Sequence, residues 1–187
     1  MLLETGRLFI TEWRREDWVA FRPIASDPEV MRYIGTGEPW PDARIEHFVN
    51  IQIERFAAYG FCLWKLTEKA TDRLIGFCGL QRLSGTEEIE SGWWLARMYW
   101  GKDLATEAGR VVLRHAFEIL GLRRVVAIAQ PQNGASLRVM QKLGMQYERD
   151  WVRDGIPVVL YAIANPDATH LMSAKSQGKD CDHNCTG

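Results

Sequence analysis

Residues 90–108 read E-S-G-W-W-L-A-R-M-Y-W-G-K-D-L-A-T-E-A. The apolar residues at the start predict a short strand, Gly101 predicts a tight turn, and the residues from Leu104 onward predict the start of a helix. Such a turn directs several backbone N–H groups without helical partners toward one point, where the helix dipole adds partial positive charge. The stretch therefore predicts a binding site for a phosphate or pyrophosphate group.

The sequence on both sides of this stretch alternates between strand and helix patterns. Strand patterns cover residues 7–13, 61–66, 74–80, 90–96, 124–130, 145–152 and 157–163. Helical patterns with capping signals cover residues 17–24, 27–34, 42–59, 104–120 and 133–143. The pair Asp154-Gly155 predicts a hairpin between the last two strands. The order predicts one α/β domain on a mixed sheet over residues 1–166 and a flexible tail over residues 167–187.

Composition limits the class of protein. The chain has 187 residues, of which 47% are hydrophobic and 25% charged, as in an ordinary globular protein with one domain. A formal net charge of -1 argues against recruitment of nucleic acid or of an anionic membrane. We see no apolar run of about eighteen residues and no signal peptide. Cys62 and Cys78 lie in apolar runs, where reduced thiols are expected, so we expect a cytoplasmic protein.

Five motifs occur in a fixed order along the chain. They are T-G-R-L (5–8), S-D-P-E-V-M-R-Y-I-G (26–35), L-I-G-F-C-G-L (74–80), W-G-K-D-L-A-T-E-A (100–108) and Q-P-Q-N-G-A-S-L-R-V-M-Q-K-L-G-M (130–145). Together they closely resemble the GNAT superfamily of acetyl-CoA-dependent N-acetyltransferases, in its RimJ/RimL-like branch of ribosomal-protein N-terminal acetyltransferases. The resemblance covers roughly residues 2–164. It implies a mostly antiparallel, twisted sheet of six to seven strands flanked by helices, with a strand splay that forms the acetyl-CoA slot.

The resemblance also assigns the turn after the third central strand to the CoA pyrophosphate, and the strand edge before it to pantetheine. The implied CoA-binding residues are Trp94, Leu95, Ala96, Met98, Trp100, Gly101, Lys102, Asp103, Leu104, Ala105, Thr106, Asn133, Ser136 and Met140. Two residues depart from the family pattern: Met98 replaces a common Gln or Arg, and Asp103 replaces a common Gly or Ala. A carboxylate near a pyrophosphate repels it unless turned away, and Lys102 and Arg97 are candidates to compensate.

Acetyl transfer to an amine requires removal of a proton from the ammonium group. Glu90, on the strand that borders the slot, is the leading candidate for the base, and a solvated surface carboxylate is the alternative. Glu12 and Asp150 are lesser candidates. His115, in the middle of a predicted helix, is expected to be a surface or packing residue. An α-amino group with a pKa of ~8 has a larger neutral fraction at pH 7 than a lysine amine with a pKa of ~10.4, so it depends less on a strong base for deprotonation.

The acyl oxygen and the departing thiolate also need hydrogen bonds. A backbone N–H on the Trp94–Leu95 edge is the simplest donor to the oxygen. The resemblance places Met140 where many relatives carry a Tyr, and Met140 has no proton to donate, so Ser136 is our candidate for stabilising the thiolate. Asn133 is the predicted N-cap of the following helix and, by resemblance, a partner of the pantetheine amide. Met140 is then expected in the core or in the lining of the slot.

The acceptor is expected between residues 31–40 and the final hairpin. Tyr33, Trp40 and Trp151 are candidates to line that cleft, although aromatic residues more often serve packing. Asp150, Asp154 and Glu38 predict a mildly acidic rim suited to a cationic amine. The expected acceptor is a protein N-terminus or a small amine, and the expected state of the protein is a monomer or a homodimer.

Two further features of the sequence bear on function. Cys181, His183 and Cys185 form a cluster that suggests a metal site, but three ligands on an unstructured tail predict no specific site, and no metal is expected. The alternative to an enzyme is a CoA-binding regulatory or interaction module without turnover, which Met98, Asp103 and Met140 favour.

Overall fold

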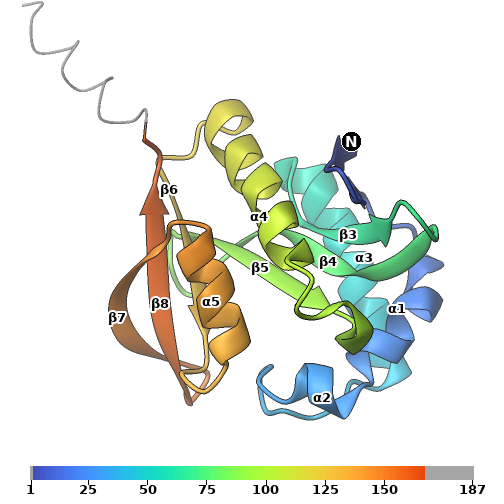
Figure 1. The fold of residues 1–187 in the computed structure, drawn as a ribbon. Coiled ribbons are helices and arrows are strands. Elements are labelled where there is room, and N and C mark those ends of the chain that lie inside the picture. Colours follow the sequence, from blue (N-terminus) through green and yellow to red (C-terminus); the bar gives the residue numbers. More distant parts are fainter. Residues whose placement is uncertain (1, 167–187) are drawn as a thin grey trace, which may run out of the picture.

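The computed structural model describes residues 2–166, so Cys181, His183 and Cys185 lie outside the described residues. Eight strands form one sheet in the order β1-β2-β3-β4-β5-β6-β8-β7 (Figure 1). The strands are β1 (Leu2–Glu4), β2 (Leu8–Thr11), β3 (Leu63–Glu68), β4 (Arg73–Arg82), β5 (Ile89–Leu95), β6 (Arg124–Ala129), β7 (Gln146–Arg153) and β8 (Ile156–Ala164). The pair β5–β6 is parallel and every other pair is antiparallel.

The predicted sheet is confirmed, with one strand more than expected. The additional strand is β1, which has three residues and pairs with β2 at the edge of the sheet. A segment this short shows too few alternations for its pattern to be read from the sequence. The predicted hairpin is also confirmed, because Asp154 and Gly155 both adopt positive φ, at 50° and 79°, between β7 and β8.

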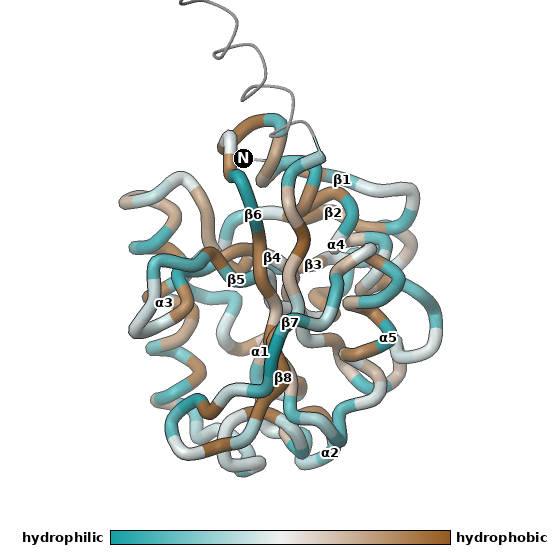
Figure 2. The backbone as a smooth tube through the Cα atoms, turned by 90° about the vertical axis from the view of Figure 1, so that its left-hand side faces the viewer, coloured by the Kyte–Doolittle hydropathy of each residue, from teal (hydrophilic) through white to brown (hydrophobic). Residues whose placement is uncertain are grey.

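Helices cover both faces of the sheet. They are α1 (Asp17–Ala25), α2 (Pro28–Met31), α3 (Asp42–Tyr59), α4 (Leu104–Arg114) and α5 (Gly134–Lys142). Figure 2 views the sheet nearly edge-on, with α3 on one side and α4 and α5 on the other. None of the helices within residues 2–166 has both the length and the hydrophobicity needed to cross a membrane.

Helix α4 packs closely on the sheet because its inner face carries small residues. Ala105, Ala108 and Gly109 are buried there, and a Cβ built on Gly109 would lie 2.8 Å from a methyl group of Leu143 after α5. The helix continues as one wider π-helical turn, His115–Ile119, and ends before Gly121 at a φ of 64°. The predicted helix over residues 104–120 is thus present, and its small residues bring α4 close to both β5 and α5.

His115 is a packing residue, as predicted. Its side chain is buried, and its ring meets the edge of the buried Trp64 ring at a centroid distance of 5.6 Å. Burial lowers the pKa of this imidazole below its usual value, which keeps the ring neutral. Cys62 and Cys78 are buried free thiols, and burial raises the pKa of Cys78 to about 12.

The sheet divides between β5 and β6. These strands are paired at a single position, Glu90 opposite Val126, whereas β4 and β5 pair from Arg82–Ile89 to Gly76–Leu95. Beyond Glu90 the two strands diverge (Figure 1). The predicted splay is therefore present, and residues 93–95 of β5 have no neighbouring strand on that side.

Candidate active site

The turn between β5 and α4 has the backbone conformation that an anion site requires. After the 3₁₀ turn η1 (Arg97–Tyr99), Gly101 and Asp103 adopt φ values of 71° and 60°, and α4 begins at the next residue, Leu104. A positive φ is natural for glycine and tolerated by aspartate. The free N–H groups at the start of α4 therefore face the space in front of the turn.

The carboxylate of Asp103 is held by a neighbouring cation. Its Oδ1 accepts a hydrogen bond from Nζ of Lys142 at the end of α5, and this contact lowers the pKa of the exposed Asp103 carboxyl. The ion-pair partner of Asp103 is thus Lys142, not one of the two candidates Lys102 and Arg97. Lys102 lies over the Tyr99 ring, and Arg97 lies 4.0 Å from Asp27.

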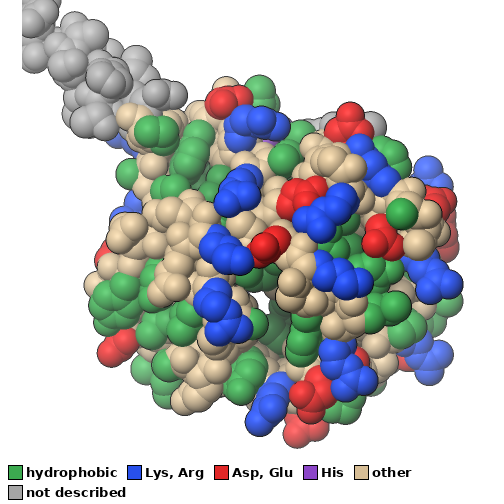
Figure 3. All heavy atoms as spheres, in the orientation of Figure 1, with side chains coloured by type: hydrophobic (Ala, Val, Ile, Leu, Met, Phe, Trp, Pro, Cys, Tyr) green, Lys and Arg blue, Asp and Glu red, His purple; other side chains and the backbone are tan. Residues whose placement is uncertain are grey.

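A cavity of about 350 Å³, here called the α4-side cleft, opens in front of this turn. Ten of the residues predicted to bind CoA line it: Trp94, Leu95, Trp100, Gly101, Asp103, Leu104, Ala105, Thr106, Asn133 and Ser136. The cations Arg32, Arg138 and Lys142 outnumber the carboxylates Glu29 and Asp103 in its lining, and Figure 3 shows Lys and Arg side chains around the hollow on this face. Positive charge at a helix start is the setting that phosphate groups favour.

Four predicted residues do not line the α4-side cleft. Met140 was expected either in the core or in the lining of the slot, and it is fully buried in the core. The Met98 side chain is 64% exposed and contributes to neither cavity described here. Ala96 and Lys102 are also absent from both linings.

One hydroxyl group in the cleft lacks a partner. Thr106, in the first turn of α4, is only 2% exposed, and its Oγ1 has no hydrogen bond within the described structure. A buried hydroxyl without a partner is costly, so such groups often mark the place of a ligand. The orphaned Oγ1 therefore fits a phosphate oxygen at this helix start.

The free edge of β5 presents alternate backbone groups to the splay. The N–H of Ala96 donates to the carbonyl of Ile75 on β4. Because successive N–H groups of a strand point to opposite sides, those of Trp93 and Leu95 point away from β4 and into the splay. The carbonyl of Leu95 on that side accepts a hydrogen bond from the Trp100 indole at 2.8 Å. Of the predicted Trp94–Leu95 pair, Leu95 thus has the accessible N–H.

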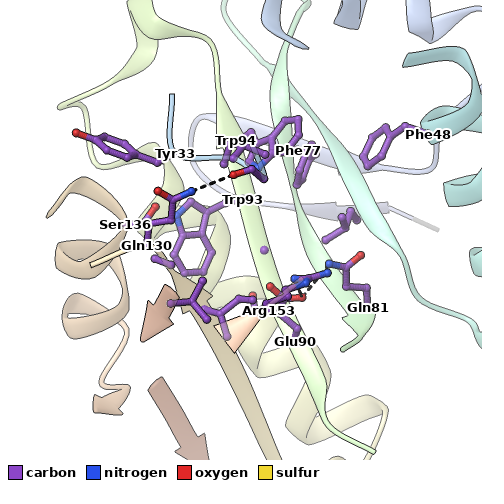
Figure 4. A pocket seen from close by; sticks show the side chains of 18 of the residues that line it. Tyr33, Phe48, Phe77, Gln81, Glu90, Trp93, Trp94, Gln130, Ser136 and Arg153 are labelled. Carbon is purple, nitrogen blue, oxygen red and sulfur yellow. Dashed lines mark hydrogen bonds and ion pairs between the residues drawn. The ribbon is translucent and has the colours of Figure 1, made fainter. Parts of the chain in front are cut away.

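A second cavity, here called the α3-side pocket, lies on the other face of the sheet and has a volume of about 460 Å³. Its walls carry the aromatic side chains of Tyr33, Trp40, Phe48, Phe77, Trp93 and Trp94. Trp94 stacks on Phe48 with an interplanar angle of 7° and meets Trp40 edge-on at 4.8 Å. The aromatic cluster gives the pocket rigid apolar walls (Figure 4).

Glu90 lies at one end of the α3-side pocket in a hydrogen-bonded network. Its Oε2 accepts a hydrogen bond from Nε2 of Gln81 at 2.9 Å and one from Arg153 at 3.3 Å (Figure 4). The Oε1 of Gln81 accepts in turn from Arg55 at 2.8 Å. Glu90 is only 5% exposed, so the alternative of a solvated surface carboxylate is wrong.

The environment of Glu90 changes its acidity. Burial raises the pKa of this carboxyl above its usual value, while the charge of Arg153 and the hydrogen bond from Gln81 act in the opposite direction. The net direction is upward. A carboxylate with a raised pKa accepts a proton more readily than a solvated one, which suits a general base.

The two cavities meet at the splay. Tyr33, Ile34, Trp93, Trp94, Asn133 and Ser136 line both of them. Asn133 caps α5 as predicted, because its Oδ1 accepts a hydrogen bond from the backbone N–H of Ser136 at 3.1 Å. That bond uses only the backbone of Ser136, whose hydroxyl lies where the cavities join.

The expected acceptor cleft needs three corrections. Tyr33 and Trp40 line the α3-side pocket, but Trp151 packs instead with Leu83, Val126 and Leu160 in a separate small core. Of the predicted acidic rim only Asp154 lines the pocket, while Glu38 and Asp150 do not. Asp150, considered as a base, is exposed and accepts a hydrogen bond from Tyr147, and Glu12 is also absent from the lining.

Arginines, which were not among the residues predicted for the acceptor site, contribute most of the charged side chains in the α3-side pocket. Arg44 and Arg55 come from α3, and Arg153 comes from the end of β7. The α3 pair could have been found, since positions 44, 48, 51 and 55 repeat every three to four residues and share one helix face. Arg153 could not, because the fold brings it to Glu90 from 63 residues away.

Comparisons with known proteins agree with this architecture. The family model described as acetyltransferase (GNAT) domain matches residues 7–146. The uncharacterized N-acetyltransferase YnaD of Bacillus subtilis (strain 168) is 33% identical over 152 residues, which cover 79% of this chain and 84% of YnaD. Among solved structures, the GNAT-family acetyltransferase from Bacillus anthracis matches with a TM-score of 0.77 at 27% identity, covering 88% of this chain and 99% of that one.

A further solved structure is that of RimL, titled as a ribosomal L7/L12 alpha-N-protein acetyltransferase in complex with coenzyme A. It matches with a TM-score of 0.74 and covers 88% of this chain and 98% of its own. At 13% sequence identity, this likeness concerns the fold alone.

Proposed function

The chain belongs to the GNAT family of acetyltransferases and is an N-acetyltransferase, and on this basis we propose that it transfers the acetyl group of acetyl-CoA directly to a primary amine, either a protein N-terminal α-amine or a small amine. The observation that carries the proposal is the meeting of two cavities at the splay, one from each face of the sheet. Two substrates that enter from opposite faces can react there in a ternary complex.

The residues of the α4-side cleft fit acetyl-CoA. The N–H groups at the start of α4, the orphaned Thr106 hydroxyl and the side chains of Arg138 and Lys142 suit the pyrophosphate. The free edge of β5 suits pantetheine, which would run beside it as an added strand. When bound, acetyl-CoA supplies the thioester carbon that the amine attacks.

Three groups of this chain would then act on the reacting atoms. Glu90 accepts the proton of the ammonium group, directly or through water, so that the nitrogen can form the new C–N bond. The N–H of Leu95 donates to the acyl oxygen. As the C–S bond breaks, the Ser136 hydroxyl passes its proton to the departing thiolate, which leaves as the thiol, and regains a proton that the amide nitrogen loses after the new C–N bond has formed.

A thiol-release assay tests this proposal. Purified protein is mixed with acetyl-CoA and a panel of peptides with free N-termini, polyamines and small amines, and CoA affinity is measured separately by calorimetry. We expect CoA to bind and thiol to be released only in the presence of an acceptor. Tight binding of acetyl-CoA without release from any acceptor would contradict turnover and support the alternative of a CoA-binding module.

A further inference from the structure

Strands β4 and β5 form the floor of the α3-side pocket, and the middle of this floor carries no side chain. Three facing pairs of residues follow one another on this side of the two strands: Gln81 and Glu90, Gly79 and Gly92, and Phe77 and Trp94. Figure 4 shows the polar pair at one end and the aromatic pair at the other. The space beside Gly79 is occupied by the backbone of residues 62–64, whereas Gly92 lines the pocket.

The space over Gly92, here called the glycine gap, is open. A Cβ built on Gly92 would lie 3.4 Å from Cδ2 of Leu63 and, within the described structure, within 4 Å of no other atom outside residues 91–93. Two residues of β5 separate Gly92 from Glu90, a length of about 7 Å that the Glu90 side chain and one water molecule can span. The next residue, Trp93, directs its N–H into the splay. The glycine gap therefore lies between the candidate base and the opening to the α4-side cleft.

The charges of the pocket suit an acceptor with a single ammonium group. Two carboxylates are present among the described residues of the lining, and Arg153 contacts both, Glu90 at 3.3 Å and Asp154 at 3.8 Å. The Asp154 side chain is 88% exposed, so Glu90 is the buried carboxylate of the pair. Arg44 and Arg55 complete the charged lining. One ammonium group can lie beside Glu90, whereas a second would meet arginines instead of another buried carboxylate.

The walls beyond the glycine gap suit an aromatic body. The ring centroids of Trp94 and Phe77 are 4.9 Å apart, and Phe48 of α3 lies 5.4 Å from Phe77. Trp40 meets Trp94 edge-on. Because these rings hold one another in place, a ligand does not have to order them. An aromatic ring that enters this pocket gains from the burial of apolar area and from ring–ring geometry.

We propose that the glycine gap is the binding position of the acceptor amine, and that the acceptor is a small aromatic monoamine whose uncharged ring lies against Trp94 and Phe48. Glu90 takes the ammonium proton across the gap, directly or through one water molecule, and the freed nitrogen faces the splay beside Trp93. Gly92 determines whether the amine fits, because any larger residue would place its side chain between the base and the nitrogen. This inference rests on the proposed acetyl transfer and narrows its substrate class.

A panel of amines tests the substrate class. The compounds 2-phenylethylamine, 2-cyclohexylethylamine and propylamine each carry one amine, spermidine carries several, and each is assayed for thiol release from acetyl-CoA. We expect kcat/KM for 2-phenylethylamine to exceed that for propylamine at least about tenfold, because a ring is buried. It should exceed that for 2-cyclohexylethylamine at least about twofold, because aromatic rings pair. Equal or faster reaction of any of the three other amines would overturn the inference.

The variant Gly92→Ala tests the position of the amine. The added methyl group enters the glycine gap, so kcat/KM should fall at least about tenfold, and by a similar factor for 2-phenylethylamine and propylamine, because both place their amine there. CoA affinity and the melting temperature should stay unchanged. Gly6→Ala is the matched control, since Gly6 lines neither cavity and a Cβ built on it has no contact within 4 Å. Full activity of Gly92→Ala would contradict the assigned position.

The variant Phe48→Leu tests the position of the ring. It replaces one aromatic wall by an apolar side chain and should lower kcat/KM for 2-phenylethylamine about threefold or more. The value for propylamine, which does not reach this wall, should change less than about twofold. An equal loss for both amines would contradict contact between Phe48 and the acceptor ring.

A binding measurement keeps this inference separate from the proposed turnover. Trp40, Trp93 and Trp94 line the pocket, so their fluorescence reports occupancy. With CoA in place of acetyl-CoA no transfer occurs, and 2-phenylethylamine should bind at least about tenfold more tightly than propylamine. Preference for the aromatic amine without turnover would contradict only the proposed reaction, whereas turnover without this preference in either assay would contradict only this inference.

Discussion

The carboxylate of Glu90 is buried, hydrogen-bonded and next to a cation, and these three conditions act differently on its proton affinity. Burial dominates and raises the pKa. Activity that depends on the ionised form should therefore fall as the pH is lowered through this raised pKa, at a pH where an exposed carboxyl group would still be charged.

We expect Glu90→Gln to lower kcat about 10²- to 10⁴-fold and to remove that acid limb of the kcat/KM profile, with CoA affinity intact. The profile should be measured with an acceptor whose amine is neutral across the whole range, so that its own titration does not contribute. Thermal unfolding serves as the control, since the variant removes the buried carboxylate that pairs with Arg153. An acid limb that persists in Glu90→Gln would exclude Glu90 as the base.

Ser136 and Asn133 form a natural pair of variants. Ser136→Ala keeps the backbone N–H that Asn133 caps and removes only the hydroxyl at the junction of the cavities. We expect at least about tenfold slower transfer with an unchanged melting temperature. Asn133→Ala removes the cap and should cost about 1 kcal/mol of unfolding free energy. Loss of stability in Ser136→Ala, measured by chemical denaturation, would instead indicate a structural role.

Strand β4 shows why particular glycines are required in the sheet. A Cβ built on Gly79 would lie 2.1 Å from the carbonyl oxygen of Cys62 and 2.7 Å from the backbone of Leu63 and Trp64. Its partner across the sheet, Gly92 on β5, would place a Cβ 3.4 Å from a methyl group of Leu63, which is ordinary contact. At Gly79, the backbone of residues 62–64 thus occupies the space that a side chain would need.

Gly79→Ala should therefore lower the unfolding free energy by at least about 3 kcal/mol, because backbone atoms have to move. Gly92→Ala, with the same chemical change at the paired position, should cost less than about 1 kcal/mol. Urea unfolding of both variants gives the comparison. Similar losses in the two variants would show that the approach of β3 to β4 is not the limiting contact.

At the level of the whole molecule, the sheet consists of β1–β5 and β6–β8, which pair at Glu90 and Val126. In the free protein the N–H groups of Trp93 and Leu95 should exchange rapidly with solvent deuterium, and those of Trp94 and Ala96 slowly, because the latter face β4. CoA should slow Trp93 and Leu95 selectively. Residue-resolved hydrogen exchange measures this alternation, and uniform protection in the free protein would contradict the open edge.

The fold was largely predictable because its elements carry local signals. The glycine turn at Gly101, the cap at Asn133 and the Asp154-Gly155 hairpin each depend on a few neighbouring residues. The charge of the α3-side pocket was not predictable in this way. It depends on Arg153 meeting Glu90 across the sheet and on Arg55 turning toward Gln81. Such contacts follow from tertiary packing, to which a single sequence gives no direct access.

The open edge of β5 also has a consequence for self-association of the protein. Unpaired strand edges recruit strands from other molecules and seed aggregates. Here the free edge faces inward across the splay, where a thin linear molecule fits but the sheet of a second folded copy does not. The outermost strands are protected differently: β1 has only three residues, and β7 carries exposed Glu148, Arg149 and Asp150. The edge of β5 that faces the splay is therefore also the edge that a strand of a second copy cannot reach.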